Sequence, residues 1–202
     1  IGPERKSRVI TDREKKITAY HEAGHALVAH NLKLVDPVQK ISIISRGRAA
    51  GYTLKTPMED KRLHSKEEFV EELAVLVAGR MAEKIIFNDV TTGASADLRT
   101  ATDLAKAIVT EYGMSDKLPL RTFGTSDELI FLGREMHEGR DYSEKTSEAI
   151  DAEVGKLFDD AVKTAGEILN TKKADLEKIV AALMVKETME KDEFEAIVGK
   201  KQ

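Results

Sequence analysis

The sequence predicts a mainly α-helical fold with a small β-hairpin or sheet and a C-terminal helical bundle. Apolar residues recur every three or four positions along most of the chain, as on the buried face of amphipathic helices. Two-residue alternation is confined to two short stretches, Val38–Ser45 and Gly51–Thr56. The 202 residues are 41% apolar, which is enough for one substantial domain or two small ones.

The elements follow from these periodicities in order. The basic segment 1–11 contains Gly2-Pro3 and is predicted to be a linker leading into a helix at 12–31. Two extended segments follow, at 38–45 and 51–56, joined by a turn at 46–48. Helices are then predicted at Ser65–Ile86, Ser95 to near Gly113, Ser143–Leu169, Ala174–Val185 and Asp192–Val198, with Ser95 as an N-cap and a long loop at Ser115–Asp141.

Composition excludes several classes of protein. The chain has no cysteine, so disulfides, thiolate nucleophiles and cysteine-rich zinc sites are excluded. A net charge of -4 with interspersed signs argues against nucleic acid as a partner. No apolar run approaches the roughly 20 residues that span a bilayer, and no secretory signal is visible. Because the chain begins at Ile1, we expect a piece of a longer protein whose anchor or motor lies upstream.

The most informative motif is His21-Glu22-Ala23-Gly24-His25. On a helix, a spacing of four places both imidazoles on one face, while Glu22 lies about 100° away from His21. Two zinc ligands and one general base in this pattern are typical of metalloproteases that activate water. Gly24 inside a helix costs about 1 kcal/mol relative to Ala, which indicates that something approaches the backbone there.

A catalytic zinc ion needs a third protein ligand, and the predicted first helix does not supply it. In the extended metzincin pattern the next Gly and His would stand where this chain has Val28 and Asn31. His30 lies about 140° around the helix from His25 and is expected to be an ordinary helix-end histidine.

Two distant carboxylates are the candidates for the third ligand. Asp97 shares a helix face with Ala101 and Ile108, so its carboxylate points where the helix is apolar. Glu83, on the preceding helix, could be a ligand or could accept the N–H of a ligand histidine and so fix its orientation. Spacing alone does not separate these two residues. Asp103 lies about 240° from Asp97 and is expected at the surface.

Six motifs carry a resemblance to a known family, and they extend along most of the chain. They are Gly2 to Ser7, Tyr20 to Ala26, Gly51-Tyr52-Thr53, Ala78 to Glu83, Thr92 to Asp97, and Phe131 to Arg134 with Tyr142 to Glu144. In these motifs the chain resembles the peptidase domain of the FtsH family, the membrane-anchored AAA+ zinc metalloproteases of bacteria and organelles. It departs from that family at Ala96, where Asn is usual, and at Ala50, where Leu or a similar residue is usual.

The resemblance implies roles for individual residues. It implies that His21, His25 and Asp97 bind one zinc ion per chain, that Glu22 is the catalytic base, and that Glu83 supports a ligand histidine. The extended run Gly51-Tyr52-Thr53 is similar to the edge strand that pairs with substrate backbone in the family. An interior hairpin strand is the alternative interpretation of this run.

The resemblance also implies an organisation beyond this chain. Segment 1–11 would link to an upstream AAA ATPase domain, 12–142 would be the zinc metallopeptidase core, and 143–202 the C-terminal helical part of the same domain. The implied assembly is a homo-hexamer anchored at the cytoplasmic face of the bacterial inner membrane, or at an organelle membrane in a eukaryote, although the fragment itself would be soluble. ATP would bind only the full-length protein, since this chain lacks a Walker-type loop.

These observations predict a zinc-dependent endopeptidase that acts on unfolded polypeptide. A non-catalytic interaction module with a structural zinc ion is one alternative. It is disfavoured because a structural zinc ion needs four protein ligands, and the sequence offers no obvious fourth one. A structural site also gives no role to a base such as Glu22 beside the metal. A zinc hydrolase of small molecules is a third hypothesis that the motif does not separate from the first.

Overall fold

The structure is a computed structural model that describes residues 11–44, 51–55, 63–124 and 141–201. Most of the predicted linker, the turn at 46–48, and the motif at 131–134 lie outside these residues. Within them the fold is mainly α-helical with one small antiparallel sheet, which confirms the predicted fold class. No helix of this part of the chain combines the length and the apolar character that crossing a membrane requires.

The helices and strands lie close to the predicted positions. The helices are α1 (Asp12–Asn31), α2 (Lys66–Phe87), η1 (Thr92–Ala94, a 3-10 turn), α3 (Ser95–Thr110), α4 (Glu144–Thr171), α5 (Lys173–Lys186) and α6 (Lys191–Val198). The strands are β1 (Val38–Ser42), β2 (Tyr52–Lys55) and β3 (Thr188–Glu190).

Side-chain caps fix the start of the first two long helices. Thr11 and Glu14 form a capping box at α1, and Ser65 and Glu68 form another at α2. The prediction that Ser95 caps α3 is wrong, because Ser95 is already helical. The 3-10 turn η1 precedes it, and the Thr91 side chain accepts the Gly93 N–H instead.

The sheet has β1 at its centre, with β2 and β3 on either side. Both pairings are antiparallel, and Ile41 of β1 lies opposite Thr53 of β2 and Met189 of β3. The strand β3 was not predicted, since three residues are too few to show alternation. Among the described residues β2 therefore forms one edge of the sheet.

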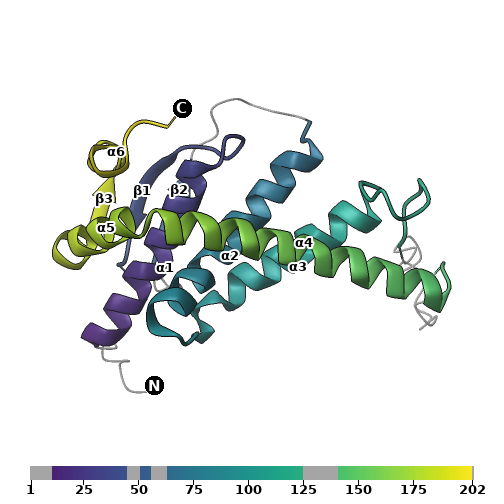
Figure 1. Cartoon of the computed structure of the whole chain (residues 1–202), viewed down its shortest axis with the longest axis horizontal. Coiled ribbons are helices and arrows are strands. Elements are labelled where there is room, and N and C mark those ends of the chain that lie inside the picture. The colour runs from purple at the N-terminus through teal and green to yellow at the C-terminus, as the bar shows by residue number, and fades with distance from the viewer. Residues whose placement is uncertain (1–10, 45–50, 56–62, 125–140, 202) are drawn as a thin grey trace, which may run out of the picture.

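Helix α1 crosses the centre of the molecule and packs against α2, α5 and β1 (Figure 1). Its side chains from Ala19 to Ala29 are all buried. At Gly24 a Cβ would lie 2.8 Å from Ala82 Cβ and 3.0 Å from the Ala78 carbonyl oxygen, so α1 and α2 approach closely there. The close approach predicted from a glycine inside a helix is confirmed.

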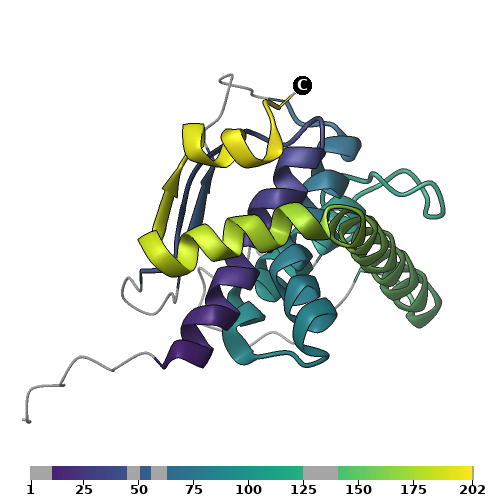
Figure 2. The same cartoon turned by 60° about the vertical axis from the view of Figure 1, so that its left-hand side comes forward.

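The long helix α4 packs across α2 and extends beyond the body of the molecule (Figure 2). Its C-terminal half joins the main core through Ala161, Ala165 and Leu169. Its N-terminal half contributes Ile150 to a second small cluster with Phe123 and other apolar side chains. Helix α4 thereby contacts both the main core and this smaller cluster.

Candidate metal centre

Helix α1 buries both histidines of the motif against α2. His21 is 8% exposed and His25 is 7% exposed, and their rings meet edge to face. A spacing of four residues brings the two rings together on the inner face of the helix. The Nε2 atoms of the two rings are 3.1 Å apart.

Hydrogen bonds to the outer nitrogens fix the tautomer of both rings. His21 Nδ1 lies 2.7 Å from Glu83 Oε1, and His25 Nδ1 lies 2.7 Å from the carbonyl oxygen of Val75. An ionised carboxylate and a carbonyl only accept hydrogen bonds, so each Nδ1 donates. In the neutral rings both Nε2 lone pairs therefore point toward the space between them, as ligand nitrogens do in zinc sites.

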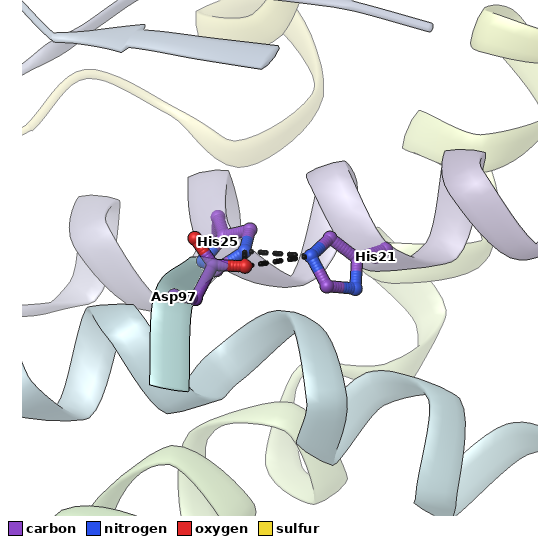
Figure 3. Close-up of side chains that lie close together, drawn as sticks. All are labelled: His21, His25 and Asp97. Carbon is purple, nitrogen blue, oxygen red and sulfur yellow. Dashed lines mark hydrogen bonds and ion pairs between the residues drawn. The ribbon is translucent and has the colours of Figure 1, made fainter. Parts of the chain in front are cut away.

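Asp97 completes the group from the first turn of α3 (Figure 3). Its Oδ2 lies 3.2 Å from His21 Nε2 and 3.6 Å from His25 Nε2. Ligands of a tetrahedral zinc ion lie about 3.3 Å from one another, because each is about 2.0–2.1 Å from the metal. The two nitrogens and one oxygen thus have the spacing, the chemistry and the number of a three-ligand zinc site.

The charges of the group also favour a cation. Burial disfavours a charged imidazole, but hydrogen bonds to Asp97 and Glu83 outweigh it and raise the pKa of His21 to about 9. Burial would raise the pKa of Asp97, but its contacts with His21 and His25 hold that pKa well below its usual range. Without a metal ion, the space between the ligand atoms attracts a proton. A divalent cation in that space could bind all three atoms, His21 Nε2, His25 Nε2 and Asp97 Oδ2.

Gly79 of α2 leaves room for the imidazole rings of His21 and His25. A Cβ at this position would lie 2.5 Å from the Nε2 atoms of both His21 and His25, closer than any real Cβ contact. The helix therefore presents bare backbone opposite the ligand nitrogens. Like Gly24, Gly79 accepts a helix-propensity cost of about 1 kcal/mol relative to Ala, here at the side of the metal site.

Glu83 connects α2 to both ligand-bearing helices. Its side chain is 1% exposed, and its two oxygens have separate donors. Oε1 accepts from His21 Nδ1, and Oε2 accepts from the backbone N–H of Thr91 at 2.7 Å. One carboxylate thereby orients His21 and also anchors the turn that precedes Asp97.

Glu22 is also buried, at 7% exposure, and it lies beside the two histidines in sequence. Burial raises the pKa of its carboxyl group, and the positive potential of His25 and His21 opposes that shift. The hydroxyl of Thr53 lies 3.0 Å from Glu22 Oε2, so β2 contacts α1 at the motif. A buried carboxylate next to a cation site has the properties of a general base.

His30 and Asp103 lie outside the metal site, as predicted. His30 stacks edge to face on Phe194, away from the other two histidines, and Asp103 is exposed. The sequence did not point to the Val75 carbonyl or the Thr91 N–H, because backbone groups carry no residue signal. The contribution of Gly79 could have been inferred from the same helical-glycine signal as that of Gly24.

Comparison with known protein families gives a match to the model described as Peptidase family M41 over residues 8–197. The chain belongs to peptidase family M41. The match confirms the resemblance to the FtsH peptidase domain, and it covers α1 and α3, which carry the three candidate ligands, and α2, which carries Glu83.

Individual relatives of this M41 chain are close in sequence. It is 50% identical over 196 residues to "ATP-dependent zinc metalloprotease FtsH 1" of Thermomicrobium roseum, which covers 97% of this chain and 30% of that protein. It is 47% identical over 198 residues to "ATP-dependent zinc metalloprotease FtsH" of Caldicellulosiruptor bescii, covering 98% of this chain and 32% of that protein. The chain therefore spans about a third of the length of these relatives.

Proposed function

We propose that this chain is the zinc-dependent endopeptidase domain of an ATP-dependent, membrane-anchored protease. The observation that carries the proposal is the convergence of His21 Nε2, His25 Nε2 and Asp97 Oδ2 beside the buried carboxylate of Glu22. Membership of a peptidase family and relatives named as zinc metalloproteases support zinc as the ion. His21, His25 and Asp97 would hold it, one ion per chain.

Glu22 acts as the general base in this mechanism. A bound zinc ion supplies the Lewis acidity that activates water and polarises a peptide carbonyl. Glu22 takes a proton from the attacking water as the water oxygen bonds to the carbonyl carbon. Glu22 then delivers that proton to the leaving nitrogen when the C–N bond breaks. Glu83 keeps Nδ1 of His21 protonated, so that Nε2 stays available as a ligand.

The edge strand β2 is the proposed substrate-binding element, with Gly51, Tyr52 and Thr53 aligned along an extended chain. An unfolded polypeptide would add to the sheet by main-chain pairing, which tolerates many side-chain sequences. The position of β2 at the sheet edge, next to α1 and Glu22, supports this proposal.

The intact protein would contain more than this chain. Relatives named as ATP-dependent, of which this chain covers about a third, support an upstream AAA ATPase domain that binds ATP. We propose that 1–11 links to that domain, that 12–142 is the peptidase core and that 143–202 completes it. Homo-hexameric assembly and anchoring at the cytoplasmic face of the bacterial inner membrane, or at an organelle membrane, belong to the same proposal.

The exchange Glu22→Gln tests the assigned chemistry. The amide keeps the shape of the side chain and loses the base, so zinc content and melting temperature should stay unchanged. Cleavage of unfolded casein should fall by about 10²- to 10⁴-fold, the usual contribution of general base catalysis. Mass spectrometry of the products distinguishes a peptidase from a hydrolase of small molecules. Near wild-type cleavage by the variant would exclude Glu22 as the base.

Light scattering and paired digestions test the assembly. We expect hexamers of the isolated chain that cleave an unfolded substrate without ATP and leave the folded form of the same protein intact. A chain that stays monomeric at high concentration would contradict the hexamer but not the peptidase.

A further inference from the structure

The side chain of Thr53 makes a specific contact with Glu22. Its hydroxyl oxygen lies 3.0 Å from Glu22 Oε2 and 3.2 Å from the Glu22 carbonyl oxygen. The hydroxyl has a single hydrogen, and an ionised carboxylate accepts a stronger hydrogen bond than a neutral carbonyl. Across residues 11–44, 51–55, 63–124 and 141–201, no other group donates a hydrogen bond to this carboxylate.

Strand β2 also leaves space for the other oxygen of Glu22. Gly51 directly precedes β2, and its Cβ position, like the Thr53 hydroxyl, faces Glu22 of α1. A Cβ at Gly51 would lie 2.9 Å from both Cγ and Oε1 of Glu22, and 2.7 Å from the carbonyl oxygen of Ser42. The strand thus places a hydroxyl at Oε2 and bare backbone near Oε1.

We propose that Thr53 is a positioning residue for Glu22, whose hydroxyl holds Oε2 so that Oε1 accepts the proton from water. This inference rests on the proposed function of Glu22 as the base. A base must lie within about 2.6–3.2 Å of the oxygen whose proton it takes, and a carboxylate free to rotate satisfies this only part of the time. Thr53 restricts the carboxylate to one orientation.

The proposal gives Thr53 two separate functions. Its main chain lies in the edge strand that would pair with substrate, and its side chain orients the base. The backbone contacts would affect substrate binding, whereas the hydroxyl would affect the chemical step. The two contributions can therefore be separated kinetically.

Three variants separate these contributions. Thr53→Val keeps the branched shape and removes the hydroxyl, Thr53→Ser keeps the hydroxyl, and Thr110→Val removes a hydroxyl that bonds only within α3. We expect Thr53→Val to lower kcat by about 10- to 100-fold, the value of one hydrogen bond to a charged group, with KM within about twofold. Thr53→Ser should keep kcat within about threefold of the wild type, and Thr110→Val should match the wild type.

Zinc content and melting temperature are measured on every variant, so that a loss of metal or fold is not mistaken for a loss of positioning. A wild-type kcat in Thr53→Val overturns the proposal. So does a rise in KM alone, since that result assigns the hydroxyl to substrate binding. Equal loss in Thr53→Ser and Thr53→Val, with zinc retained, also overturns it.

A second measurement does not depend on activity. In crystals of the wild-type chain we expect one orientation of Glu22, with Oε2 on the Thr53 hydroxyl, and in crystals of Thr53→Val more than one orientation. A single, unchanged Glu22 conformer in the variant overturns the proposal. If the wild-type chain cleaves no peptide, the proposed function fails, while this comparison still decides whether Thr53 orients Glu22.

Discussion

His21 Nε2 lies 3.1 Å from His25 Nε2, and both rings donate a hydrogen bond from Nδ1 on their far side. Two nitrogen lone pairs this close repel each other unless a proton or a metal ion lies between them. Two buried hydrogen bonds, from His21 Nδ1 to Glu83 and from His25 Nδ1 to the Val75 carbonyl, hold the rings in place against this repulsion. A pair of imidazoles held in this way is preorganised for a cation, and the third ligand decides how tightly it is bound.

Replacing Asp97 tests the third ligand. Asp97→Ala removes Oδ2, and zinc affinity should fall by more than about 100-fold, since even partners outside the ligand set cost 10–100-fold. Asp103→Ala is the matched control on the same helix and should bind zinc like the wild type. Elemental analysis after dialysis against a weak chelator measures both. Equal zinc occupancy in the two variants would move the assignment to Glu83.

Gly79→Ala should exclude the metal by filling its space. The added Cβ would meet both Nε2 atoms at 2.5 Å, so either a ring or a helix must shift. We expect loss of bound zinc and of peptidase activity. The control is Gly155→Ala in α4, where a Cβ meets nothing within 4 Å. That exchange should retain zinc and raise the free energy of unfolding by about 0.4–1 kcal/mol, as measured by urea denaturation.

Glu83→Gln should weaken both zinc binding and the fold. The two oxygens of Glu83 each accept from a donor, and an amide group turns its own N–H toward one of those donors. Leaving a buried donor unsatisfied costs about 1–3 kcal/mol, and loss of a ligand's partner lowers zinc affinity by about 10- to 100-fold. Glu67→Gln, at an exposed position in the first turn of α2, should change neither. Wild-type zinc affinity in Glu83→Gln would contradict the orienting role of this carboxylate.

Tyr20 should titrate later than an ordinary tyrosine. Burial and the hydrogen bond that Tyr20 donates to Glu177 at 2.6 Å raise its pKa to about 12. The folded pKa exceeds the unfolded value of about 10, so between these values the folded state binds more protons than the unfolded state. The stabilisation is therefore complete below pH 10 and is lost as the pH rises through about 12.

The phenolate absorbance of wild-type and Tyr20→Phe chains measures this difference. The late step that belongs to Tyr20 should appear in the wild type and should be missing from the variant. Urea denaturation above pH 10 should show a steeper loss of stability with pH in the wild type than in Tyr20→Phe. If the free energy of unfolding falls with pH at the same slope in both chains, the contact with Glu177 does not raise the pKa of Tyr20.

The local part of the candidate site was predictable from the sequence. The four-residue spacing of His21 and His25 fixes their common face wherever the helix packs. Gly24 indicated a close approach to the backbone of this helix, and the structure identifies α2 as the neighbour. Both inferences need only the geometry of one helix. The bounds predicted for α1, 12–31, match the structure, in which Thr11 and Glu14 form a capping box at its start.

The nonlocal part was not predictable from periodicity. Glu83 and Asp97 both contact His21, and the turn between their helices decides that Asp97 reaches Nε2 while Glu83 reaches Nδ1. That turn depends on the left-handed conformation of Asn88 and on the bond from the Thr91 N–H to Glu83. Strand β3 pairs with a strand some 150 positions away, so no local pattern could reveal it.

The separation of the ligands along the chain has a consequence for biosynthesis. Asp97 stands 76 positions after His21, so a ribosome adding about 5–20 residues per second completes the proposed ligand set about 4–15 s after it adds His21. The nascent domain has no third ligand until α3 has emerged and docked on α2. With Asp97 as a ligand, the chain is inactive for this first part of its translation, and a peptide bond near the ribosome cannot be cleaved at this site before Asp97 has been added.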